Sequence, residues 1–166
     1  MQKYKPLPSQ EKLLELFDYK DGDLYWKEKI NSSTDLSKPA GSSLSTGYRR
    51  ITIEGETYKY HRLIWKYHYG VDPKNQIDHV DGNKLNNCIQ NLREATNQEN
   101  SFNRGAQKNN KLGIKGIRKV GDKYRTEIMV KGKTKHLGCF YTLEEAKIVR
   151  QKAEEKYFKG FAYKEK

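Results

Sequence analysis

The sequence has few apolar residues and no long apolar run. Hydrophobic side chains make up 34% of the 166 residues. That fraction is too small for one large core, so we expect two compact units with modest cores. No stretch approaches the ~20 apolar residues that cross a bilayer. The N-terminal MQKYKPLPSQEK also lacks the apolar core of a signal peptide. A soluble, intracellular protein is therefore expected.

Cysteine is scarce as well. The two cysteines, Cys88 and Cys139, do not belong to CxxC pairs, which excludes a cysteine-rich zinc ribbon and gives no disulfide framework. Burial statistics favour two buried free thiols in a reducing compartment.

Acidic residues are outnumbered, and the imbalance is uneven along the chain. Lys and Arg total 33 against 21 Asp and Glu, for a net charge of +12. Residues 105–166 hold 17 Lys and Arg against 7 Asp and Glu, whereas residues 1–104 hold 16 against 14. A nearly neutral half joined to a basic half suggests a division of labour in which the second half holds phosphate.

The first half reads as a mixture of short helices and strands. Ser9 predicts the cap of a helix over 11–17, and Gly70 predicts the end of a helix over 61–69. The Gly-centred turn at 54–56 lies between two alternating segments and predicts a β-hairpin. The polar stretch 31–47 is expected to be a loop.

The second half predicts a three-stranded antiparallel sheet packed on one helix. Gly-containing turns separate the segments IKGIRKV, KYRTEIMV and TKHLGCF. The T-x-x-E pattern at 142–145 is a capping box, and small and apolar residues recur behind it at helical spacing. Alternation on the second strand predicts that Thr126 and Ile128 face the helix while Arg125 and Glu127 face outward.

The segment IDHVDGNKLNNCIQNLREATNQENSFNR carries the candidate chemistry. Asp78 and His79 end a short apolar strand, where adjacent Asp and His serve no packing purpose. The carboxylate can bind a hard divalent cation, and the imidazole can take a proton from water at neutral pH. Asn100 follows on a predicted short helix, and the order strand, turn, strand, helix would bring it to the same cation as Asp78.

These residues resemble the HNH nucleases, specifically the zinc-free branch found among homing endonucleases. The matching pieces are HRLIW, QIDHVDGNKLNN, IQNLR and TNQEN, over about 61–104. The resemblance implies a ββα-metal (HNH, or His-Me finger) module in which Asp78 and Asn100 ligate the metal and His79 is the general base. It also implies that Asn91 holds the loop so that the imidazole points at water, and that Asn86 and Asn87 support the turn. Position 100 is Asn where the family name implies His.

Each residue also has an ordinary structural explanation. Asp78 and Asp81 could cap a turn, where Asp is favoured. His79 alone could be a surface histidine. His61 could contact a phosphate or brace the site, and packing at a helix start is equally compatible with its position.

Residues 113–161 resemble the DNA-binding domain of plant ethylene-response factors, whose sheet lies in the major groove. Tyr124 and His136 stand where that family usually has Trp. The resemblance and the strand pattern predict DNA contacts from one set of residues: Lys115, Arg118, Lys119, Arg125, Glu127 and His136.

The sequence thus predicts an α+β protein with an HNH module over 1–104, a linker over 105–112 and a DNA-binding domain over 113–166. The predicted function is hydrolysis of duplex DNA by a monomeric, nicking endonuclease of the homing type. It would use one divalent cation, Mg²⁺ with Mn²⁺ accepted, and no structural zinc. If the gene belongs to a phage or mobile element, the protein would work in the host cytoplasm or nucleoid. The alternatives are a DNA-binding regulator with a decayed nuclease fold and an RNA-binding protein, although no RNP-like aromatic motif is present.

Overall fold

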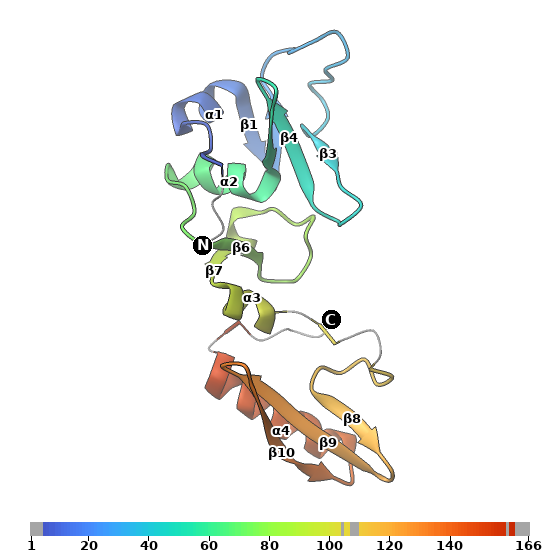
Figure 1. Ribbon diagram of the computed structural model, residues 1–166. Helices are drawn as coiled ribbons and strands as arrows, with labels where there is room; N and C mark the ends of the chain where they lie inside the picture. Colours follow the sequence, from blue (N-terminus) through green and yellow to red (C-terminus); the bar gives the residue numbers. More distant parts are fainter. Residues whose placement is uncertain (1–4, 104, 107–109, 159, 162–166) are drawn as a thin grey trace. The chain divides into compact units, whose positions relative to one another are not determined.

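The computed structural model describes residues 5–103, 105–106, 110–158 and 160–161. It divides into two compact units, residues 1–96 and 97–166. Both are mixtures of short helices and small antiparallel sheets (Figure 1). The division lies within the stretch 1–104 that the sequence groups as one module. Within the described residues, no helix is both long and apolar enough to span a membrane.

The first unit begins with a capped helix and a tight hairpin. Helix α1 (Gln10–Leu16) starts at Ser9, whose hydroxyl accepts a hydrogen bond from the Lys12 amide at 3.2 Å. Strands β1 (Phe17–Lys20) and β2 (Asp23–Trp26) follow. Asp21 and Gly22 join them with φ of 51° and 91°. This left-handed pair matches the right-handed twist of the two strands. The predicted helix is therefore confirmed.

A three-stranded sheet and a second helix follow. Strands β3 (Ser42–Ser43), β4 (Arg49–Ile53) and β5 (Glu56–Lys59) lie in the order β3-β4-β5. The short β3 lies in the stretch that was expected to be a loop. Its two residues form a strand because they pair with the start of β4. Helix α2 (Tyr60–Tyr69) ends at Gly70, which has a φ of 70°.

Strand β6 (Gln76–His79) pairs antiparallel with β7 (Leu92–Ala95), and the short helix η1 (Ile89–Asn91) precedes β7. Ile77 and Leu92 join this small sheet to the core of the first unit. The other buried members of the core come from α1, α2, the earlier strands and, for Ala40, the loop before β3: Leu13, Phe17, Leu24, Ala40, Ile51, Ile53, Tyr60, Leu63 and Ile64. The candidate site is therefore built on packed strands, which fix the backbone at residues 78 and 79.

The second unit contains α3 (Asn97–Phe102), then β8 (Ile117–Val120), β9 (Lys123–Val130) and β10 (Lys133–Phe140), and finally α4 (Leu143–Phe158). The strands form an antiparallel sheet with β9 in the centre, and α4 packs against it (Figure 1). Thr126 and Ile128 are buried while Met129 is exposed, which confirms the predicted alternation on β9. The ring of Phe102 stacks on Phe158 with centroids 4.0 Å apart, so α3 is anchored within this unit.

Two details differ from the sequence predictions. Both cysteines are free, but Cys139 is exposed and Cys88 only half-buried, so the expectation of two buried thiols was wrong. Cys139 lies on β10 directly opposite Arg125, on the outward face of the sheet. The helix α4 also buries a charge, since Arg150 is 5% exposed and pairs with Glu154. Its guanidinium also donates to the backbone carbonyl of Glu127.

Candidate active site

Asp78 and His79 are both buried at the end of β6. Asp78 is 6% exposed and His79 is 3% exposed. Strand pairing sets Asp78 directly opposite Arg93 on β7. The Arg93 Nε and Nη2 atoms donate to Asp78 Oδ2 at 2.9 and 2.8 Å. The guanidinium compensates the buried carboxylate, which would otherwise be costly to keep charged.

Asn87 fixes which nitrogen of His79 carries the proton. His79 Nε2 lies 3.0 Å from Asn87 Oδ1, and the Asn87 amide nitrogen donates to the Leu85 carbonyl at 3.1 Å. A carbonyl can only accept, so the amide nitrogen faces Leu85 and the oxygen faces the histidine. That oxygen needs a donor, so neutral His79 carries its hydrogen on Nε2. The lone pair of the imidazole is therefore on Nδ1.

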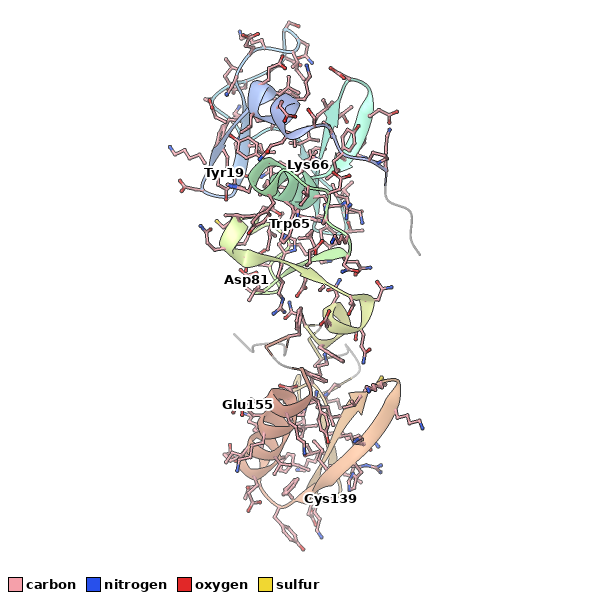
Figure 2. All side chains as sticks on the ribbon, turned by 90° about the vertical axis from the view of Figure 1, so that its left-hand side faces the viewer. Tyr19, Trp65, Lys66, Asp81, Cys139 and Glu155 are labelled. Atoms are coloured by element: carbon pink, nitrogen blue, oxygen red, sulfur yellow. The ribbon has the colours of Figure 1, made fainter. Side chains whose placement is uncertain are left out.

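The turn between His79 and Asn87 is held by a network around Asp81, which Figure 2 labels on the loop after β6. Asn91 donates to Asp81 Oδ1 at 2.9 Å and to the Asn86 carbonyl at 2.8 Å, and its side-chain oxygen accepts from the Asp81 amide. Asn86 donates to Asp81 Oδ2 at 2.8 Å. Burial acts to raise the pKa of Asp81, but the hydrogen bonds from Asn86 and Asn91 lower it below its ordinary value. Asn91 thus contacts the loop, whereas Asn87 contacts the imidazole.

Two aromatic rings pack around the His79 imidazole. His61, at the start of α2, meets it edge to face with centroids 5.4 Å apart. The Tyr48 ring lies 5.5 Å from His61 and 6.2 Å from His79. Burial lowers the pKa of His61 to about 3, so this ring is neutral at physiological pH. Burial also lowers the pKa of His79, although the hydrogen bond that His79 donates to Asn87 and the nearby Asp78 carboxylate partly oppose that effect. His79 is therefore held in its basic, neutral form.

The predicted metal site contains one carboxylate that a hard divalent cation could use. Among the residues the structure describes, no group of three or more His, Cys, Asp or Glu side chains could hold a metal without help. Mg²⁺ is usually bound by one or two carboxylates, with waters and substrate phosphates as its other ligands. Asp78 offers one such buried carboxylate. Asn100, the other predicted ligand, lies on α3 in the second unit, and its pairing with Asp78 stays a prediction.

The predicted DNA-contact residues fall into two groups in the second unit. Arg118, Arg125 and Cys139 are cross-strand neighbours, and His136 lies opposite Glu127. Glu127 pairs with Arg125 at 2.5 Å and with Arg118 at 3.6 Å. These side chains share the outward face of the sheet.

The other two predicted residues lie apart from that face. Lys119 lies opposite Tyr124 and so points to the other side. Lys115 precedes β8, and its ammonium donates to the carbonyls of Ser101 and Phe102 at 3.1 and 2.8 Å. It therefore caps the end of α3.

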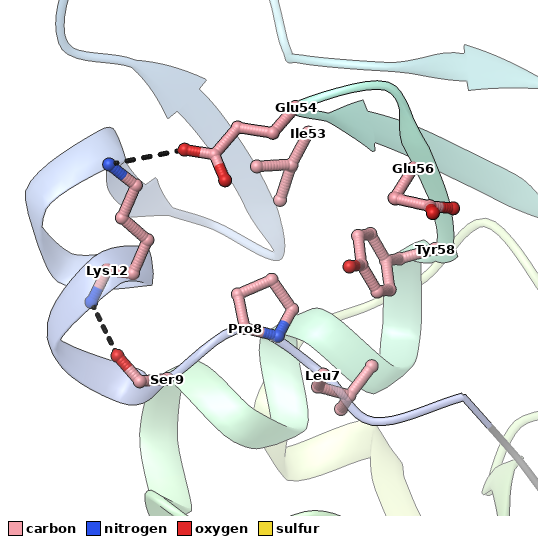
Figure 3. A pocket seen from close by; sticks show the side chains of 8 residues that line it. All are labelled: Leu7, Pro8, Ser9, Lys12, Ile53, Glu54, Glu56 and Tyr58. Carbon is pink, nitrogen blue, oxygen red and sulfur yellow. Dashed lines mark hydrogen bonds and ion pairs between the residues drawn. The ribbon is translucent and has the colours of Figure 1, made fainter.

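A separate hollow lies on the first unit between the N-terminal segment and the β4–β5 hairpin (Figure 3). Its charged side chains are paired with one another or with neighbours, as Lys12 is with Glu54 at 3.6 Å and Glu56 with Lys5. None of its lining residues belongs to the segment from Asp78 to Asn91. The Asp78–His79 pair remains the better candidate for chemistry.

Asp78 and His79 lie in a segment that is similar to a known protein family. Residues 58–102, which run from β5 to the end of α3, match the HNH endonuclease family. The nuclease resemblance inferred from the sequence is thereby confirmed for this segment. The resemblance of the second unit to ethylene-response factors stays a prediction.

Three relatives show the same likeness. An uncharacterized HNH endonuclease of Acanthamoeba polyphaga mimivirus is 38% identical over 87 residues, covering 52% of this chain and 44% of the relative. Protein 3.8 of Escherichia phage T7 is 40% identical over 76 residues, 44% of this chain and 63% of the relative. A prophage-derived protein of Bacillus subtilis, whose name describes an HNH homing endonuclease, is 40% identical over 57 residues, 34% of this chain and 33% of the relative. The chain thus spans less than two thirds of each relative. No solved structure matches it.

Proposed function

We propose that the chain is a metal-dependent HNH endonuclease that hydrolyses phosphodiester bonds of duplex DNA. The observation that carries this proposal is the arrangement at the end of β6. A buried histidine is fixed by Asn87 in the tautomer with its lone pair on Nδ1, and the adjacent residue is a buried carboxylate. The match of residues 58–102 to HNH endonucleases supports the same function.

In this proposal each side chain has one task. His79 Nδ1 takes the proton from the water that attacks phosphorus, and Nε2 keeps its hydrogen bond to Asn87 throughout. Asp78 and Asn100 would hold one divalent cation, Mg²⁺ or Mn²⁺, which supplies positive charge to the phosphoryl oxygens and the leaving oxygen when bound. Arg93 orients the Asp78 carboxylate through two hydrogen bonds to Oδ2. Asn91 keeps the turn rigid.

The outward face of the second unit would hold the DNA. Arg118 and Arg125 present guanidinium groups on that face, and Glu127 between them sets their spacing. Arginine pairs with guanine and with phosphate, whereas glutamate accepts from cytosine. One active-site motif per chain cuts one strand at a time, so a monomer would nick. The similarity to a protein named as a homing endonuclease supports a mobile-element origin.

The decisive test is relaxation of supercoiled plasmid with Mg²⁺ or Mn²⁺, with and without EDTA. We expect wild-type relaxation that EDTA stops and that His79→Ala lowers by about 10²–10⁴-fold, the usual contribution of a general base. Binding to linear duplex should persist in the variant. Lys38→Ala, at an exposed residue of the first unit that is paired with Asp35 at 2.9 Å, is the control and should retain cleavage. Equal cleavage by wild type and His79→Ala would reject the mechanism, and binding without any cleavage would favour the regulator.

A further inference from the structure

Lys84 lies on the turn that follows His79, and its ammonium is held in one place. The Lys84 Nζ atom donates to the Thr46 carbonyl at 2.9 Å and lies 4.5 Å from the centroid of the Tyr48 ring. The stem of the lysine passes over Gly47, where an added Cβ would lie 3.6 Å from Lys84 Cδ. The left-handed φ of 81° at Gly47 lets the backbone turn beneath the lysine.

The loop that holds Lys84 also contacts the candidate base. Tyr48 precedes β4, and its ring touches both the lysine ammonium and the imidazole of His79, whose centroid is 6.2 Å away. Two hydrogen bonds tighten this loop, from the Leu44 amide to the Tyr48 carbonyl at 2.7 Å and from the Gly47 amide to the Leu44 carbonyl at 2.9 Å. The Tyr48 ring therefore packs against both the Lys84 ammonium and the His79 imidazole.

The charge of Lys84 is not neutralised by a carboxylate. Across the part of the chain that the structure describes, no Asp or Glu oxygen forms an ion pair with its ammonium. By contrast, Arg49 pairs with Asp23, Arg93 with Asp78 and Arg150 with Glu154. Lys84 is exposed, and an ammonium has three donors, of which the Thr46 carbonyl uses one. An ordered, exposed cation with donors to spare is suited to an external anion.

We propose that Lys84 and Tyr48 form a binding site for a backbone phosphate of DNA, next to the phosphodiester bond that the water activated by His79 would break. Lys84 Nζ donates to a phosphate oxygen, and the Tyr48 ring and the Thr46 carbonyl hold the ammonium ready for it. The preformed position reduces the entropy lost when DNA binds. This inference rests on the proposed nuclease function and adds a substrate contact within the first unit.

The test compares Lys84→Gln, Lys84→Arg and wild type in two assays. Binding to one linear duplex of fixed sequence is measured in EDTA at several salt concentrations. Loss of one phosphate contact should reduce the magnitude of the slope of log K against log salt by about 1. Plasmid relaxation below saturation should fall about tenfold in Lys84→Gln, as expected for a charged hydrogen bond. Lys84→Arg, which keeps the charge, should restore much of both.

Lys38→Gln is the matched control, because Lys38 is exposed in the same unit but already paired with Asp35 at 2.9 Å. It should leave the slope and the rate unchanged. An unaltered slope in Lys84→Gln overturns the phosphate site, even if the thermal midpoint falls, because the lysine would then only brace the loop. If wild type does not relax plasmid, the proposed nuclease function fails, yet the salt slope still decides whether Lys84 contacts phosphate.

Discussion

The segment around His79 and the outward face of the second unit use charge in opposite ways. Asp78, His79 and Asn87 are all at most 6% exposed, and each has a fixed partner. On the sheet face Arg118 is exposed, Arg125 is half-buried, and both pair with the carboxylate of Glu127. Proton transfer depends on one atom in one orientation, so each side chain of the first region is held by specific hydrogen bonds. Holding a polyanion depends on summed charge, so the second region can be redundant.

The strongest way to break this comparison is to remove one arginine from each region. Arg93→Met leaves the carboxylate of Asp78 buried without its guanidinium, and we expect a loss of about 3–5 kcal/mol in the free energy of unfolding of the first unit. Arg125→Met removes a half-buried partner of Glu127 on the solvent-facing side of the sheet and should cost the second unit less than about 1 kcal/mol. Hydrogen exchange of the β6–β7 and β8–β9 amides reads each unit separately. Equal losses would contradict the distinction.

The tautomer of His79 offers a sharper test, because it needs no assay of activity. In wild type, ¹⁵N chemical shifts of the imidazole should show the hydrogen on Nε2. Asn87→Leu removes the acceptor, so both tautomers should be populated, and cleavage should fall about 10–100-fold, as for other residues that orient a reactive group. Asn86→Leu, which loses the bond to Asp81 without touching His79, is the control. A pure Nε2–H tautomer in Asn87→Leu would refute the role of Asn87.

The sequence predicted which residues gather at the site better than it predicted their contacts. Helix and turn signals such as Ser9, Gly55 and Gly70 are local, and the structure confirms them. Contacts that depend on register or on distant loops could not be found in this way. The opposition of Asp78 and Arg93 needs the pairing of β6 with β7, and the approach of Tyr48 to His79 needs a loop thirty residues earlier in the chain.

The burial of polar side chains also could not be predicted from the local sequence pattern. Arg150 lies in a stretch of α4 rich in charged residues, yet its guanidinium joins the helix to the backbone of β9. Gly116 marks this contact, since a Cβ there would lie 2.6 Å from Arg150 Nη1. Similarly, Lys115 was predicted to contact DNA, and its hydrogen bonds to the carbonyls at the end of α3 emerge only once the unit is folded.

A smaller difference between the two units is expected in how the free energy of unfolding falls with pH, because only the first unit contains the buried His61. His61 has a folded pKa of about 3 and an ordinary unfolded value near 6.5. Above pH 6.5 both states are neutral at this residue. As pH falls below that value the unfolded chain gains the proton first, so stability is lost by about 1.4 kcal/mol per pH unit until the folded pKa is reached.

Urea unfolding between pH 7 and 5 measures this loss in wild type and in His61→Phe, where the contribution should disappear. Leu63→Met, a substitution of similar volume in the same helix, controls for packing and should keep the wild-type pH dependence. An identical pH dependence in wild type and His61→Phe would mean that the His61 ring accepts a proton in the folded protein without cost.

The smallest effects on DNA binding are expected for substitutions on the sheet face, because several basic side chains there contribute to the same binding. Arg118→Gln combined with Arg125→Gln should weaken duplex binding by about tenfold and reduce the magnitude of the salt slope by about 1 to 2, since each lost phosphate contact removes about one. Lys147→Gln combined with Lys152→Gln removes the same charge from the exposed surface of α4, so net charge cannot explain a difference between the pairs. If the two pairs change the slope equally, DNA is held by overall charge and not by the β8–β10 face. Only an effect confined to the arginine pair places the DNA on that sheet.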